Sequence, residues 1–255
     1  MIVKNEDERV KLREGGRRLA TILQTLKNKV KAGVNAQELE DEAREMISEM
    51  GDTPAFLGYK PEGADRPFPA ALCVSVNEEI VHGIPNEEPK IFAEGDLVTL
   101  DCGLIHEGFI TDSAVSVSVG SHKENDRLIQ AAEEALMAGI EKAHSGNTLG
   151  DVGHAIAQVA KQYGYHYPRE LGGHGVGAKV HEAPFVANYG TPGKGDRLRE
   201  GQVIAIEPML SLGSGAVDLA PDGYAYYTRD GSKTAHVEHT VIVGKDVAEI
   251  ITSHK

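Results

Sequence analysis

Residues 95–113 form the stretch that most restricts how this chain can fold. A turn leads into a β-type run over 97–102, and a second alternating run over 109–119 follows another turn. This pattern predicts a β-hairpin with one aspartate on each arm, Asp101 and Asp112. Residues two apart on a strand share a face, so a register that aligns these faces brings the two carboxylates together.

Two neighbouring carboxylates inside a sheet are not stable as an isolated pair. Their charges repel, and burial raises the cost unless a cation or a shared proton relieves it. A bound metal ion would resolve both problems. The alternative is two solvated aspartates at the ends of a hairpin, which is the commoner situation for an isolated pair. The metal hypothesis therefore requires further ligands elsewhere in the chain.

The composition of the 255 residues is that of an ordinary globular protein with one large domain or two small ones. A formal net charge of -13 argues against a nucleic-acid-binding surface, because phosphate contacts need clustered Lys and Arg. Cys73 and Cys102 are the only cysteines, which excludes a disulfide framework and suits a reducing cytoplasm. No signal peptide or membrane-spanning stretch is visible, so we expect a cytoplasmic protein.

Hydrophobic spacing predicts the same order of elements twice. The predicted elements are a helix over about 7–30, a helix opened by a capping box at Asn35 and stopped at Gly51, strands that include 71–76 and the aspartate hairpin, helices over about 124–143 and 149–163, and strands from residue 202 onward. Helix, helix and sheet therefore occur in each half of the chain.

A short sequence echo supports an internal duplication. Val-His-Gly-Ile-Pro at 81–85 is repeated as Val-His-Glu-Ala-Pro at 180–184. Together with the repeated order of elements, the echo predicts a pseudo-twofold arrangement with the two sheets joined in one core and the helices outside. His82 and His181 would then lie on opposite sides of a central cleft.

Three further candidate ligands lie in the second half of the chain. His174 stands in a glycine-rich segment, 172–177, where little side-chain bulk obstructs a ligand, although a flexible turn with an incidental histidine is the alternative. The segment gives little support for a dinucleotide-binding loop, because no clear strand precedes it. Glu207 ends an apolar run and Glu238 interrupts a run of β-branched residues, yet either acid alone could equally be a surface glutamate.

The complete candidate set contains four carboxylates and one imidazole, from Asp101, Asp112, His174, Glu207 and Glu238. It has too many acids, and no cysteine, for a closed structural zinc site, and it matches a carboxylate-bridged pair of divalent ions. Two such ions, about 3.5 to 4 Å apart, polarise a substrate oxygen and lower the pKa of a shared water towards about 7. The sequence therefore predicts metal-dependent hydrolysis.

The chain closely resembles the type I methionine aminopeptidases, which share a "pita-bread" α/β fold with the proline-specific peptidases. The resemblance covers nearly the whole chain and is carried by segments 77–85, 95–101, 111–113, 173–177, 207–208 and 237–240. It implies an α/β (α+β) fold with a central, largely antiparallel sheet and outer helices. We expect one catalytic domain, 1–255, with pseudo-symmetric halves of about 1–120 and 121–255.

The resemblance also implies a role for each candidate ligand. Asp112 and Glu238 would bridge two divalent ions, Asp101 would chelate one ion, and the other ion would be bound by His174 and Glu207. The same ligands accept Mn²⁺, Fe²⁺, Co²⁺ or Zn²⁺, so the sequence does not select the metal.

Catalytic and substrate-binding roles follow from the same resemblance. Glu207 resembles the general base and acid, His181 the residue that steadies the carbonyl oxygen, and His82 the residue near the scissile amide nitrogen. The methionine side chain would lie in a pocket formed by Tyr59, Cys73, Val180 and Tyr224. The alternative for Cys73 is a small buried hydrophobe, and Cys102 is best interpreted as a core residue, turned away from the face of Asp101.

Three features depart from the commonest bacterial pattern, and each concerns the substrate pocket. The loop over 59–69 looks long, Cys102-Gly103 follows Asp101 as in proline-specific relatives, and the chain contains no Trp. Two alternative functions remain beside methionine removal. One is an Xaa-Pro aminopeptidase or dipeptidase, and the other is an inactive binding module of the same fold. The absence of a long insertion in the second half favours type I over type II.

The expected activity is removal of the initiator methionine from peptides and nascent chains that have a small second residue. The resemblance implies an encounter with the ribosome, and we expect a monomer that binds neither nucleic acid directly nor a membrane.

Overall fold

The computed structural model describes residues 1–253. The helices are α1 (Glu6–Lys27), α2 (Ala36–Glu49), α3 (Lys123–Lys142) and α4 (Leu149–Tyr163). The strands are β1 (Thr53–Pro54), β2 (Leu72–Val76), β3 (Glu79–Val81), β4 (Leu97–His106), β5 (Phe109–Ser118), β6 (Gly172–Gly175), β7 (Glu182–Ala187), β8 (Val203–Ile206), β9 (Met209–Ser211), β10 (Val217–Leu219), β11 (Tyr226–Thr228), β12 (Thr234–His236), β13 (Glu238–Ile242) and β14 (Glu249–Ile250). The repeated order of helix, helix and strands is confirmed.

Local sequence features set the helix boundaries close to where the sequence predicts them. Asn35 opens α2 with the predicted capping box, in which its side chain accepts from the Gln37 backbone N–H and the Glu38 side chain accepts from the Asn35 N–H. Gly164 ends α4 in the left-handed conformation, at a φ of 77°. No helix among residues 1–253 is both long and apolar enough to span a membrane.

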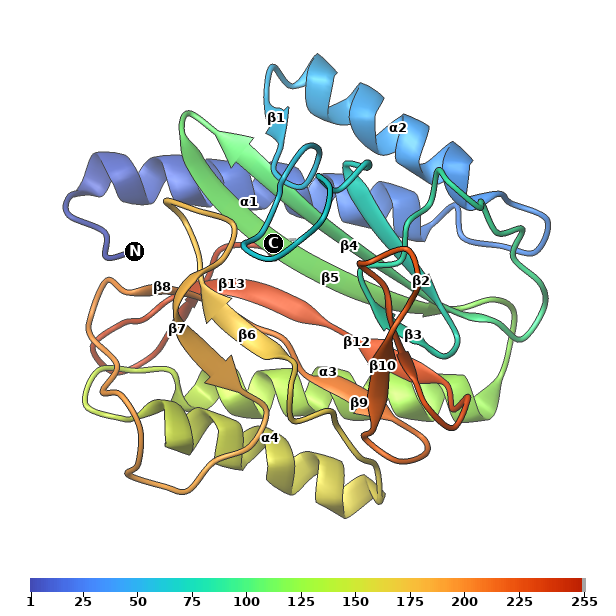
Figure 1. The fold of residues 1–255 in the computed structure, drawn as a ribbon. Helices are drawn as coiled ribbons and strands as arrows, with labels where there is room; N and C mark the ends of the chain where they lie inside the picture. Colours follow the sequence, from blue (N-terminus) through green and yellow to red (C-terminus); the bar gives the residue numbers. More distant parts are fainter. Residues whose placement is uncertain (254–255) are drawn as a thin grey trace.

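One nine-stranded sheet joins the two halves of the chain. Its main path is β1-β4-β5-β13-β8-β6-β7, with β2 beside β4 and β14 beside β13, and its pairings are antiparallel. Strand β5 from the first half pairs with β13 from the second through Ala114 opposite Glu238. Figure 1 shows these two strands side by side in the middle of the molecule.

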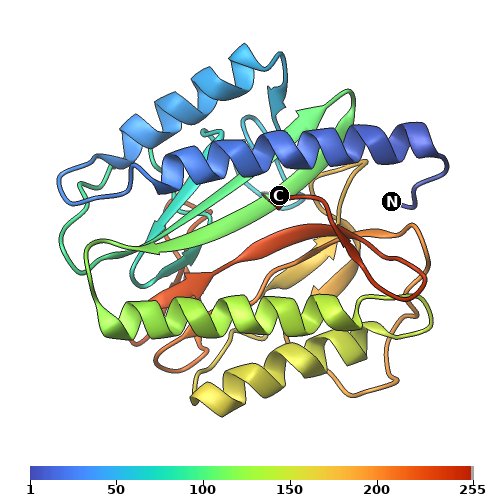
Figure 2. The same ribbon diagram turned by 180° about the vertical axis from the view of Figure 1, so that it is seen from behind.

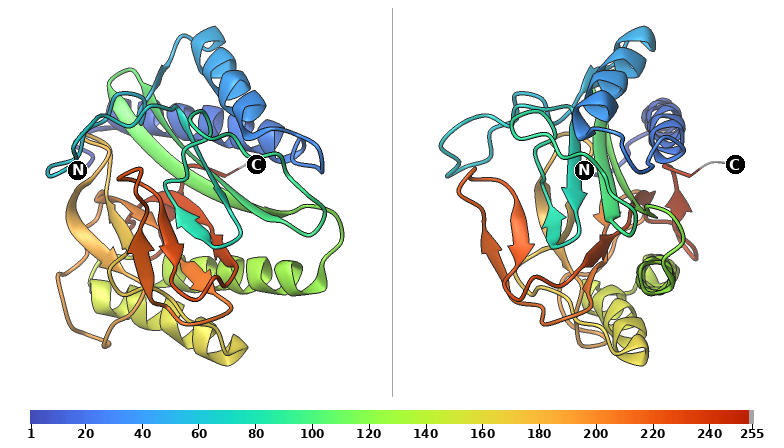
Figure 3. Two further views of the ribbon diagram at one scale, coloured as in Figure 1. Left: turned by 45° about the vertical axis from the view of Figure 1, so that its right-hand side comes forward. Right: turned by 90° about the vertical axis from the view of Figure 1, so that its right-hand side faces the viewer.

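The helices cover one face of this sheet. From behind, α1 and α3 run across that face, while α2 and α4 lie towards its outer edges (Figure 2). A side view shows these helices on one side of the sheet, with the loop after β1 and the β10–β11 pair on the other side (Figure 3). The second face is therefore enclosed by loops and short strands instead of helices.

Strand alternation divides the side chains of β4 between the two faces. Val98, Leu100 and Cys102 pack in a buried cluster with residues of α1 and α2. The intervening Thr99 and Asp101 point away from the helices, because successive side chains of a strand face opposite ways. The predicted core position of Cys102 is confirmed.

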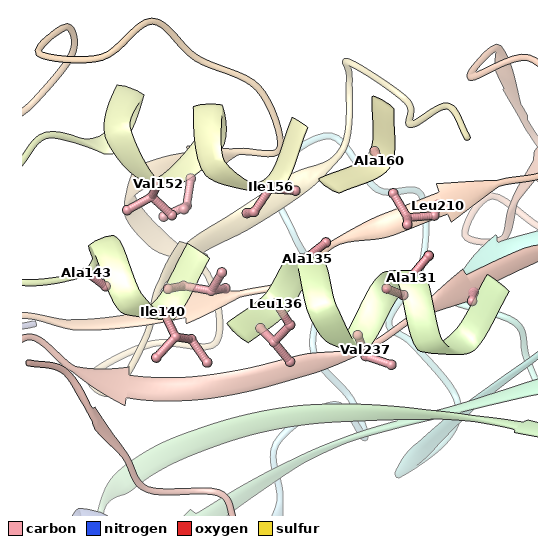
Figure 4. Packing of buried hydrophobic residues seen from close by; sticks show 14 of the residues in the cluster. Ala131, Ala135, Leu136, Ile140, Ala143, Val152, Ile156, Ala160, Leu210 and Val237 are labelled. Carbon is pink, nitrogen blue, oxygen red and sulfur yellow. The ribbon is translucent and has the colours of Figure 1, made fainter. Parts of the chain in front are cut away.

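A second core joins α3 and α4 to the other half of the sheet. Ile140 of α3, Ile156 of α4 and Val237 beside β13 belong to this cluster, whose packing is seen from close by in Figure 4. Gly139 permits the close approach of the two helices, since a Cβ there would lie 2.9 Å from Cγ1 of Ile156. The two cores hold both halves of the sheet from behind and leave the opposite face for a site.

Candidate active site

The predicted hairpin is present, and its register brings the two aspartates to one face. Asp101 pairs with Ala114 and Gly103 pairs with Asp112, so the two carboxylates are diagonal neighbours across β4 and β5. Ala114 also pairs with Glu238 on the other side, which adds a third carboxylate to the same face. The junction between the two halves of the chain is therefore the place where these acids meet.

The glycine-rich segment around His174 is a strand and not the expected loop. Strand β6 pairs with β7 and β8 at such close range that a Cβ on Gly173 would lie 2.2 Å from the Ala205 carbonyl oxygen, and one on Gly175 would lie 2.3 Å from that of Ala183. The glycines are needed for this close backbone packing, which composition alone does not reveal.

His174 is held in an orientation suited to a metal ligand. Its Nδ1 lies 2.9 Å from the Gly175 carbonyl oxygen. A carbonyl only accepts hydrogen bonds, so Nδ1 carries the proton and Nε2 presents a free lone pair. This Nε2 lies 3.8 Å from Oδ2 of Asp112 and 3.5 Å from Oε1 of Glu207.

The ligand atoms form two compact groups that share one carboxylate. Asp112, His174 and Glu238 make one group, and Glu207, His236 and Glu238 make the other, with the ligand atoms of each group within 4.8 Å of one another. Asp101 lines the same cavity but belongs to neither group. The structure thus brings all five predicted ligands to one cavity.

His236 is a site residue that the sequence analysis missed. Its side chain is buried, and its Nε2 lies 3.3 Å from Oε2 of Glu207 and 3.9 Å from Oε2 of Glu238. The available indication was its spacing, because His236 precedes the candidate ligand Glu238 by two residues in a β-type run.

Several buried oxygens of the acids have no hydrogen-bond partner among residues 1–253. They include Oδ1 of Asp101, Oδ1 of Asp112 and Oε1 of Glu238. Buried, unpaired carboxylates are strongly destabilising unless a cation compensates them. The donor set and its unpaired oxygens therefore fit divalent metal ions.

Burial and mutual repulsion change the proton affinity of these acids. Burial raises the pKa of Asp101 to about 7. Burial, together with the neighbouring carboxylates, raises the pKa values of Asp112 and Glu238 well above the ordinary range. Burial also opposes ionisation of Glu207, but the adjacent imidazoles of His236 and His174 outweigh it and lower the pKa of Glu207.

The acids lie in a cavity of about 570 Å³ whose wall includes several Phe and Tyr side chains. Among the predicted pocket residues, Tyr59, Cys73 and Tyr224 line this cavity, whereas Val180 is buried in the hydrophobic cluster that contains them. Burial raises the pKa of the Cys73 thiol well above its usual value, so this side chain is a neutral, small hydrophobe. Further lining residues that the sequence analysis did not identify are Phe56, Phe68, Met209 and Tyr226.

Both predicted catalytic histidines line the cavity. His82 has a φ of 61°, a strained conformation for a non-glycine residue, and its ring contacts Tyr226 edge-on. The ring of His181 lies 4.4 Å from that of His174, and its Nδ1 lies 3.1 Å from the Tyr59 hydroxyl. His181 keeps access to solvent at the cavity, but partial desolvation there and the adjacent histidines lower its pKa, so its imidazole is neutral near pH 7.

The raised pKa of Asp101 predicts how the ion-free protein responds to pH. Between pH 3.8 and about 7 the unfolded chain has released this proton while the folded chain retains it, so stability falls as the pH rises. We expect the Tm of ion-free protein to be several degrees lower at about pH 8 than at about pH 5.5. Thermal unfolding of wild type and Asp101→Asn measures this, because the neutral amide should reduce the pH dependence. If the Tm of Asp101→Asn depended on pH as strongly as that of wild type, the raised pKa of Asp101 would not be the cause.

Comparison with known proteins agrees with this geometry. The chain matches the model of metallopeptidase family M24 over residues 10–245. It is 45% identical over 245 residues to a methionine aminopeptidase of Aquifex aeolicus, covering 95% of each chain. It is 38% identical over 253 residues to methionine aminopeptidase 1 of Bacillus subtilis, covering 99% of each chain.

Solved structures confirm the predicted pita-bread α/β fold. A methionine aminopeptidase from Thermotoga maritima has a TM-score of 0.93 at 38% identity, with 100% of both chains covered. A prolidase from Pyrococcus horikoshii has a TM-score of 0.74 at 21% identity and is matched over 64% of its length, which shows a shared fold. The chain therefore belongs to the methionine aminopeptidases of metallopeptidase family M24.

Proposed function

We propose that this protein is a two-metal aminopeptidase that removes the initiator methionine from nascent chains and peptides with a small second residue. The observation that carries this proposal is the cluster of buried carboxylates with unpaired oxygens around the free Nε2 of His174, at the base of an aromatic cavity. The names of the full-length relatives agree with this activity.

Charge balance supports two ions instead of one. Asp101, Asp112, Glu207 and Glu238 bring four negative charges into the buried site when ionised, and two divalent ions would neutralise them. Glu238 belongs to both compact ligand groups, as expected for a bridging carboxylate. Asp112 would be the second bridge, Asp101 would chelate one ion, and the other ion would be held by His174 and Glu207. The oxygen-rich set accepts Mn²⁺, Fe²⁺, Co²⁺ or Zn²⁺.

Glu207 is suited to general base catalysis. When bound, the ions supply Lewis acidity and a water of lowered pKa. The lowered pKa of Glu207 keeps its carboxylate ionised, so it can accept the proton of the attacking water and pass it to the departing amine. Its position immediately after β8 fixes it at the end of an interior strand of the sheet.

His181 is suited to stabilising the carbonyl oxygen of the scissile bond. Because the Tyr59 hydroxyl can donate to Nδ1 of this neutral imidazole, the ring proton is placed on Nε2. An Nε2–H directed at the carbonyl oxygen stabilises the negative charge that develops there. His82 would lie near the scissile nitrogen, where the strained backbone fixes its ring.

The aromatic cavity favours an unbranched apolar side chain. Tyr59, Cys73 and Tyr224 line it, and the Phe68 ring packs edge-on against Tyr224 at 5.1 Å. Sulfur makes favourable contacts with aromatic rings, which suits the methionine thioether. Val180 was predicted to line the pocket; buried in one cluster with Cys73 and Tyr224, it would instead support this wall.

We also propose the organisation in which this site works. The repeated order of elements and the nine-stranded sheet shared by both halves support one catalytic domain over 1–255, with pseudo-symmetric halves of about 1–120 and 121–255. We propose a monomer that acts in the cytoplasm, and a nascent chain as substrate implies an encounter with the ribosome.

Substrate selection tests the proposed activity against the proline-specific alternative. We expect release of methionine from Met-Ala-Ser, tolerance of norleucine at the first position, and little release of Leu, Lys or Arg. One methylene is worth about 1 to 3 kcal/mol in such a pocket, which limits the discrimination among apolar side chains. Steady-state assays on these peptides and on Ala-Pro-Ser provide the measurement. Faster cleavage of the Ala-Pro peptide would favour the proline-specific function, and no cleavage by metal-loaded enzyme would favour an inactive binding module.

Removing a bridging carboxylate should remove metal as well as activity. Chelation should abolish turnover, and Mn²⁺, Co²⁺ or Fe²⁺ should restore it. Asp112→Ala should bind fewer ions per chain, because the repulsion between the two cations is no longer compensated. Elemental analysis and calorimetric titration measure the stoichiometry, with Asp218→Ala as a control for an exposed acid. Two ions bound to Asp112→Ala with wild-type affinity would show that Asp112 is not a bridge.

Two variants separate proton transfer from charge stabilisation. Glu207→Gln retains the shape and one oxygen but cannot accept a proton, so kcat should fall by about 10² to 10⁴. His181→Ala should retain both ions and lower kcat and kcat/KM together by about 10² to 10³. Both are measured at saturating metal alongside metal content. If Glu207→Gln stays within about threefold of wild type, another residue is the base, with His82 the first candidate.

A further inference from the structure

We propose that His236 is a positioning residue that donates a hydrogen bond from Nε2 to Oε2 of Glu207 and thereby orients the general base. This inference rests on the proposed function, since it concerns the residue assigned to proton transfer. Two imidazole nitrogens lie near the Glu207 carboxylate, Nε2 of His174 at 3.5 Å from Oε1 and Nε2 of His236 at 3.3 Å from Oε2. The two histidines have different roles because their second nitrogens have different surroundings.

The backbone of His236 is fixed independently of the metal site. The Ser116 hydroxyl accepts from the His236 N–H at 3.0 Å and donates to its carbonyl oxygen at 2.8 Å. Strand β12 also pairs His236 with Met209, two residues after Glu207. The side chain is 1% exposed and directs Nε2 towards the carboxylates. A rigid, buried imidazole therefore faces the flexible end of Glu207.

The surroundings of Nδ1 decide whether Nε2 of a histidine can bind a metal ion or instead donates a hydrogen bond. In His174, Nδ1–H is matched by the Gly175 carbonyl oxygen, which leaves Nε2 free to bind a metal. In His236, neither ring nitrogen makes an aligned hydrogen bond within 1–253, but Nε2 faces the carboxylates of Glu207 and Glu238, whereas no acceptor lies beside Nδ1 among these residues. A proton on Nδ1 would be a buried, unpaired donor, at a cost of about 1 to 3 kcal/mol. The favoured tautomer of His236 has its proton on Nε2 and therefore donates.

The recipient of this proton is the nearest carboxylate. Oε2 of Glu207 is 3.3 Å from Nε2, and Oε2 of Glu238 is farther away at 3.9 Å. A separation of 3.3 Å is longer than the usual 2.9 Å or so, and catalytic contacts of this kind tighten when the reactive complex forms. With Oε2 held by His236, Oε1 is directed towards His174. The carboxylate then cannot rotate away from the proton that it accepts.

The test compares two replacements of His236 with a control replacement of His239. His236→Gln retains an N–H donor of similar reach, and His236→Leu has comparable volume but no donor. The control is His239→Leu, which removes a half-buried histidine whose Nδ1 lies 2.9 Å from the Thr252 hydroxyl, outside the site. Wild type and the variants are assayed for kcat and KM on Met-Ala-Ser, for metal affinity by calorimetry, and for Tm without metal.

We expect kcat of His236→Leu to fall about 10- to 100-fold, with KM within about threefold and two ions still bound. His236→Gln should restore kcat to within about threefold of wild type, which a purely space-filling role would not predict. His239→Leu should lower Tm and leave kcat unchanged.

Three outcomes would overturn the inference. They are wild-type kcat in His236→Leu, loss of an ion from His236→Leu as expected for a ligand, and a kcat of His236→Gln as low as that of His236→Leu. Failure of the proposed function is distinguishable, because wild type itself would then release no methionine.

Discussion

The repulsion among the buried carboxylates is the interaction around which this structure is built. Asp101, Asp112 and Glu238 come from three adjacent strands and face the same way. One buried oxygen of each acid lacks a hydrogen-bond partner among residues 1–253, and burial raises the pKa of each acid. A fold that concentrates acids in this way is unfavourable without cations, so stability and metal binding are coupled.

The sheet keeps the acids in place despite this repulsion because their backbones are tied across the junction. The Asp112 N–H donates to the Thr240 hydroxyl, which donates back to the Asp112 carbonyl oxygen. The Ser113 hydroxyl donates to the Glu238 carbonyl oxygen at 2.7 Å. The helices behind the sheet add two hydrophobic cores. The strands therefore cannot separate to relieve the charges, and a metal ion becomes the available compensation.

The sequence was sufficient to predict those features of the structure that depend on local interactions. Alternation predicted the faces of Asp101 and Cys102, and the capping box at Asn35 predicted the start of α2. The glycines of β6 were misinterpreted because the reason for them is the backbone of β7 and β8, far along the chain. His236 was missed because its significance depends on the rotamer that brings it to Glu207. The sequence thus indicated which acids and imidazole gather in one cavity, whereas the place of His236 beside them emerged only from the fold.

The cavity wall connects recognition of the substrate to the chemistry. Tyr59 lines the cavity and its hydroxyl lies beside Nδ1 of His181, the proposed donor to the carbonyl oxygen. Tyr59 belongs to the loop after β1, which packs through Phe68 against Tyr224. A side chain that fills the cavity would contact this wall, and the Tyr59 hydroxyl in the wall would hold the proton of His181 on Nε2. The prolidase likeness at 21% identity shows that the fold is shared among these peptidases, so loops of this kind, and not the sheet, are where specificity can diverge.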